Sequence, residues 1–142
     1  METTTWPTVG TLDSAAGAGW GGLWSVMFSA ERAVGALVQV SSFAEGLDLI
    51  WLGDELRGAC DDVATSHPAA VIHAIAADLG PLPGPEHATA GRAAVAGLVS
   101  AVIRRGDELL AAQHSAAEGR WLAAITSVLF AARVHLAGTG AL

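Results

Sequence analysis

Apolar residues recur at the three- and four-residue spacing of an α-helix, and this period constrains the fold more than any other feature. Successive residues of a helix are turned by about 100°, so residues at this spacing share one face. No segment alternates regularly between apolar and polar residues, as a half-buried strand would. On the first long segment, the apolar stripe consists of Trp20, Leu23, Trp24, Met27, Phe28, Val34 and Val38.

Capping and helix-stopping residues divide the chain into helices. Residues 42–45 (SFAE) and 115–118 (SAAE) match capping boxes, and Pro68 suits the first position of a helix. Residues 80–85 are rich in Pro and Gly and predict a loop, while residues 1–12 predict an irregular N-terminal arm. The first expected helix covers about 13–40, with a firm start near Trp20. The second covers 43–64, and a short helix runs from 68 until Gly80 stops it. The last two cover about 86–114 and about 116–137.

Short connections between long helices favour antiparallel neighbours. We therefore predict an all-α fold, an antiparallel bundle of four long helices plus one short helix. A length of 142 residues suits one core, so we expect a single domain over residues 1–142.

The charge balance disfavours two classes of partner. The net charge is −7, and the seven basic residues, all Arg, form no cluster, so neither nucleic acid nor an anionic membrane surface is expected. Charged residues interrupt every long apolar stretch before the ~18 residues that a membrane span needs. The N-terminal METTTWPTVG lacks the pattern of a signal peptide, so we expect a cytoplasmic location. Arg in place of Lys, with abundant Ala and Gly, is typical of high-GC bacterial coding.

The sequence predicts no cofactor and no metal. Cys60 is the only cysteine, and no two histidines have the spacing of a helical zinc site. The Gly-rich GAGWGG lacks the Lys and the preceding strand of a phosphate loop. A metal held from different helices by Glu31, His114 and His135 is the one arrangement left open.

Two polar residues fall within apolar stripes. Glu31 lies between Met27 and Val34, so its carboxylate must be ion-paired, hydrogen-bonded, protonated or solvated. It either pairs with an Arg of another helix or belongs to a pocket. Gln113 is either a core amide or a ligand contact, and Gly106 on the same face would allow a helix or ligand to come close.

These positions support two hypotheses about function. The first is a small-molecule site, a Trp-lined apolar pocket around Glu31, which binds a small apolar ligand. If this site is catalytic, Glu31 is the general acid or base of a cofactor-independent isomerase, cyclase or lyase. The second is a non-catalytic helical interaction protein. The expected ligand-binding residues are Trp20, Trp24, Trp51, Gln113, His114, Trp121 and His135.

The last expected helix is apolar on two sides. Phe130 and Val134 project from the side opposite its main apolar stripe. A two-sided apolar helix in a small bundle needs a partner, so we expect a homodimer or higher oligomer through this helix.

Overall fold

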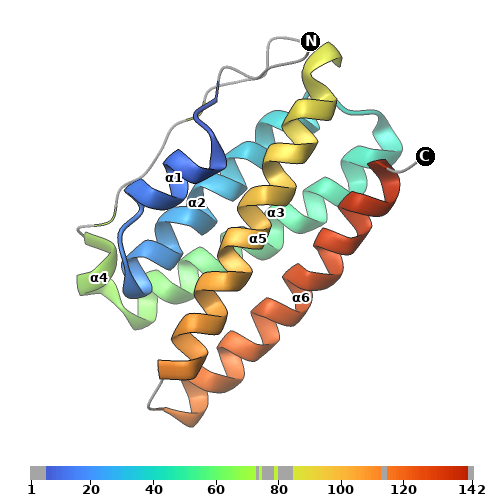
Figure 1. Cartoon of the computed structure of the whole chain (residues 1–142). Helices are drawn as coiled ribbons and strands as arrows, with labels where there is room; N and C mark the ends of the chain where they lie inside the picture. The colour runs from blue at the N-terminus through green and yellow to red at the C-terminus, as the bar shows by residue number, and fades with distance from the viewer. Residues whose placement is uncertain (1–5, 73, 75–78, 80–84, 113–114, 141–142) are drawn as a thin grey trace.

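The computed structural model of the chain describes residues 6–72, 74, 79, 85–112 and 115–140 (Figure 1). All regular secondary structure in these ranges is helical, which confirms the prediction of an all-α chain. The elements are α1 (Val9–Ala15), α2 (Gly19–Val38), α3 (Phe43–Ser66), α4 (Pro68–Ile72), the 3₁₀ turn η1 (Pro85–His87), α5 (Ala88–Ala112) and α6 (Ala116–Gly140).

Local capping chemistry sets the starts of the later helices where the sequence predicts them. The Ser42 hydroxyl accepts a hydrogen bond from the Glu45 amide and donates one to the Glu45 carboxylate at 2.8 Å. Ser115 accepts the Glu118 amide at 3.3 Å in the same way. These bonds satisfy amides that have no partner inside the helix. Pro68, as predicted, is the first residue of α4.

The N-terminal region differs from its prediction. Residues 9–12 were expected to be irregular but belong to α1, because the Thr8 hydroxyl caps the Thr11 amide at 3.2 Å. A break then separates α1 from α2, where Gly17 and Gly19 adopt φ of 81° and 67°. Side-chain-bearing residues rarely adopt this left-handed conformation, so the glycines fix the turn. Of the loop expected at 80–85, residues 80–84 lie outside the described residues.

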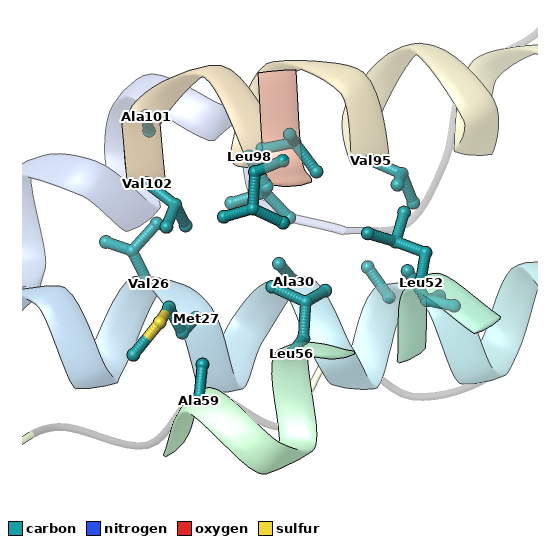
Figure 2. Packing of buried hydrophobic residues seen from close by; sticks show 14 of the residues in the cluster. Val26, Met27, Ala30, Leu52, Leu56, Ala59, Val95, Leu98, Ala101 and Val102 are labelled. Atoms are coloured by element: carbon teal, nitrogen blue, oxygen red, sulfur yellow. The ribbon is translucent and has the colours of Figure 1, made fainter. Parts of the chain in front are cut away.

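Helix α2 lies between α3 and α5, and α6 packs against α5 (Figure 1). Helices α3 and α6 approach each other closely at only a few positions. Figure 2 shows how side chains from different helices fill the core between them. The labelled core residues are Val26, Met27 and Ala30 from α2, Leu52, Leu56 and Ala59 from α3, and Val95, Leu98, Ala101 and Val102 from α5.

Close contacts at Arg105 and Gly106 of α5 hold α1 and α6 against this helix. Arg105 on α5 donates to the Asp13 carboxylate at 2.7 Å and to the carbonyl oxygens of Asp13 and Gly17, so it holds α1 and the following turn against α5. Thr126 on α6 lies against Gly106, where a Cβ atom would come within 2.6 Å of its methyl group. This contact confirms that Gly106 allows another helix to come close.

In the described part of the chain, no helix combines the length and the apolar character that crossing a membrane requires.

Two glycines of α2 should respond oppositely to the same substitution. A Cβ atom at Gly22 would overlap the Gly17 carbonyl and lie 2.5 Å from the Arg105 guanidinium, whereas Gly35 has open space around it. We expect Gly22→Ala to lower the free energy of unfolding by about 1–3 kcal/mol, because backbone atoms must move. We expect Gly35→Ala to raise it by about 0.5–1 kcal/mol, since alanine favours helix. Urea denaturation followed by circular dichroism measures both, and equal stability of the two variants would contradict the packing described at Gly22.

Candidate functional site

A line of hollows follows the seam between α3 and α6. One hollow of about 230 Å³ lies near His135, a middle one of about 400 Å³ follows, and one of about 150 Å³ lies near Trp121. The last two are both lined by Asp62 and Trp121. We call this surface the α3/α6 groove. Its edges are Asp48, Trp51, Glu55, Gly58 and Asp62 on α3, and Trp121, Ala124, Val128, Ala131 and His135 on α6.

The His135 end of the groove is bridged by polar contacts. The His135 ring lies 2.8 Å from the Asp48 carboxylate, which joins α6 to α3. Arg92 of α5 donates to Glu45 at 2.9 Å in the lining of the same hollow. Hydrogen bonds from Ser42 and Arg92 lower the pKa of Glu45, so this carboxylate stays charged. Trp51 and His135, both expected as ligand-binding residues, are brought together here.

The Trp121 end gathers three rings from three elements. The ring of Trp20 on α2 stacks on His67, with centroids 4.2 Å apart, and lies 5.8 Å from the Trp121 ring. Trp121 donates its indole hydrogen to Asp62 at 2.9 Å, and His67 lies 2.9 Å from the Glu118 carboxylate. The expected pair Trp20 and Trp121 is therefore brought together.

Sequence reasoning missed three polar members of this end. His67 ends α3, where its backbone turns to φ −133° and ψ 58°, and the sequence indicated only that a new helix starts nearby. Asp62 falls in a run of acidic residues that resembles a solvated surface, and Glu118 resembles a capping residue. No local signal relates these three residues, because they meet only when α3 and α6 pack.

Between its two ends, the groove is apolar with an acidic edge. Ala59, Ile125 and Val128 are its apolar lining residues, and of the three only Val128 is partly exposed. The carboxylates of Asp54, Glu55 and Asp62 line the same hollow, and all of its charged lining residues within the described chain are acidic.

Glu31 lies elsewhere, in a hollow of about 570 Å³ between α2 and α3. Its carboxylate accepts a hydrogen bond from Arg57 of α3 at 3.2 Å, the ion pair with another helix that the sequence left as one alternative. No tryptophan is among the described residues that line this hollow. The expected combination of Glu31 with tryptophan side chains is therefore not assembled at one place.

Of the other expected site residues, Trp24 lies outside the groove, and two are not described by the structure. Trp24 stacks on Phe28 with ring centroids 5.1 Å apart, and its carbonyl oxygen lies 3.9 Å from the Cys60 sulfur. It contributes to the core side of α2 and not to the α3/α6 groove. Gln113 and His114 lie outside the described residues.

The described residues offer little for covalent or metal chemistry. Burial raises the pKa of the Cys60 thiol to about 12, so this thiol stays protonated and is a poor nucleophile. Within the described ranges, no three His, Cys, Asp or Glu residues lie close enough to hold a metal ion. The chemistry that the groove does offer is apolar contact combined with carboxylate pairing.

Apolar side chains are also exposed outside the groove. Phe130 and Val134 of α6 are 52% and 57% exposed, and the Arg133 guanidinium lies 4.8 Å from the centre of the Phe130 ring. Neither side chain lines the groove. On the first half of α3, the large exposed apolar residues are Phe43, Leu47, Ile50 and Trp51.

Comparison with protein-family models, with curated proteins and with solved structures found no match to this chain.

Proposed function

We propose that this protein is a non-catalytic helical interaction protein that binds a helix of another protein in the α3/α6 groove. In this proposal, the four long helices act as one antiparallel bundle. The main support is that α2 packs against α3 and α5, and α5 against α6, while three hollows lie along the α3/α6 seam.

Small residues make the groove wide enough for side chains of a partner. Gly58 on α3 and Ala124 and Ala131 on α6 leave space where a closed seam would hold interlocking side chains. Trp51 is 48% exposed at the edge of this space. Exposed apolar residues beside polar ones are a common feature of protein-binding surfaces, which supports a protein partner.

The placement of the titratable groups supports binding more than catalysis. Glu31, the candidate general acid or base, is held by Arg57 in a hollow away from the tryptophans. Asp48 and Asp62 each form a bond across the groove that joins α3 to α6. Contacts of this kind hold the two helices in position.

A small apolar ligand at the Trp121 end is the second candidate. The observation that favours it is the arrangement of Trp20, His67 and Trp121 around a hollow of about 150 Å³. Flat aromatic walls with a few polar groups are typical of small-molecule sites. A cofactor-independent isomerase, cyclase or lyase reaction would have to use His67, Asp62 or Glu118 here in place of Glu31.

Homo-oligomerisation through α6 is a separate proposal. It is supported by Phe130 and Val134, which are exposed on a part of α6 that does not line the groove. An interface on these side chains would leave the groove free for another partner.

A photo-reactive benzoylphenylalanine at Ala124 should capture the groove's partner in the native host cells. We expect a discrete protein adduct that disappears when Gly58→Leu is added, because a Cβ atom at Gly58 has open space and the leucine would fill the groove. The same reagent at Gly35, an exposed position on α2 in the separate hollow that holds Glu31, serves as the control for labelling outside the groove. An Ala124 adduct that persists with Gly58→Leu, or an equal adduct from Gly35, would contradict the proposal.

Native mass spectrometry of the purified protein tests the other two proposals together. We expect a dimer mass for the wild-type protein and a monomer mass for Val134→Asp, because a charge in an apolar interface is costly. A wild-type monomer would contradict the α6 interface. A retained small molecule that is lost on Trp121→Ala would favour the ligand site over the protein-binding groove.

A further inference from the structure

An acidic row follows one edge of the α3/α6 groove. Asp48, Glu55 and Asp62 are each seven residues apart on α3, and all three line the groove. Seven residues are close to two helical turns, so the three carboxylates share one edge and span about 21 Å of helix. Glu55 stands in the middle of this row.

The opposite wall carries a matching period of four apolar residues and one histidine. Trp121, Ala124, Val128, Ala131 and His135 alternate steps of three and four residues along α6. This is the spacing at which one helix receives the apolar side chains of another. A helix lying in the groove would place its apolar stripe against this wall and its flanking positions beside the acidic row.

The negative charge of this chain disfavours a second copy of it as the occupant of the groove. The protein carries a net charge of −7, so a second copy brings like charge to a surface lined by Asp54, Glu55 and Asp62. Four of its seven arginines are also in ion pairs within the chain: Arg57 with Glu31, Arg92 with Glu45, and Arg104 and Arg105 with Asp13.

We propose that the occupant of the α3/α6 groove is a basic amphipathic helix of another protein, with Lys or Arg at seven-residue intervals beside its apolar stripe. This inference rests on the proposed function and specifies the partner's chemistry. The basic residues pair with Asp48, Glu55 and Asp62 while the apolar residues enter the hollows between Trp51 and Trp121.

The contacts that Asp48 and Asp62 already make within the chain leave room for a basic partner. Asp48 and His135 are both more than half exposed, so water weakens their pairing and a cation can compete for the carboxylate. Asp62 uses one oxygen for Trp121, and a carboxylate can accept further hydrogen bonds. Glu55 lies between these two residues and faces the middle hollow.

Two synthetic three-heptad peptides test the inference. Both carry leucine at the a and d positions, and they differ only in having Lys or Glu at one flanking position of each heptad. Fluorescence anisotropy of the labelled peptides measures their dissociation constants. We expect the Lys peptide to bind roughly tenfold or more tightly than the Glu peptide at low salt, with the ratio falling as salt screens the pairs.

Charge reversal at the centre of the row supplies the matched comparison. Glu55→Lys should reduce or invert the preference for the Lys peptide. Asp107→Lys makes the same charge change at an exposed position of α5 that lies outside the groove lining, and should leave the ratio near the wild-type value. Circular dichroism checks that both variants remain folded.

The outcomes separate this inference from the proposed function. Equal binding of both peptides, abolished by Gly58→Leu, would overturn the basic-partner inference and leave the groove as a binding surface. An unchanged ratio in Glu55→Lys would also overturn it. If neither peptide binds, the inference is wrong, and the Ala124 cross-link decides the proposed function independently.

Discussion

The burial of α2 on two sides is the constraint on which the rest of the structure depends. Met27, Ala30 and Ala33 are fully buried, and α2 packs extensively against both α3 and α5. Helix α6 packs on this core through α5, where the Thr126 side chain lies against Gly106. Because α3 and α6 are each fixed by another helix, neither has to close on the other. The α3/α6 groove lies between these two outer helices.

Side-chain bonds between α3 and α6 occur near the two ends of the groove. Asp48 with His135 marks one end, and Asp62 with Trp121 marks the other. Between them the lining is small, apolar or acidic. Polar bridges of this kind set the spacing of two helices without filling the space between them, so they preserve a surface that apolar packing would remove. The proposed partner uses this surface together with the acidic edge of α3.

Local chemistry made much of the fold predictable from the sequence, but the site much less so. The hydroxyls of Ser42 and Ser115 indicate helix starts because capping depends on nearby residues alone. The arm at residues 9–12 was predicted wrongly because the cap at Thr8 was not recognised. Periodicity assigned Glu31 to an apolar stripe, yet it could not say that Arg57 of α3 would reach it. The meeting of Trp20, His67 and Trp121 depends on helix neighbours, which no single-helix pattern encodes.

The α3/α6 seam is open to solvent at its middle hollow, while the core beside it is closed. Methyl NMR with a soluble paramagnetic agent tests this claim directly, because the agent broadens signals according to their exposure. Leu122 and Leu129 of α6 are fully buried, whereas Val128 lines the groove and is partly exposed. We predict strong broadening of the Val128 methyl signals and little broadening of the two leucines. Equal protection of Val128 and Leu129 would contradict an open groove.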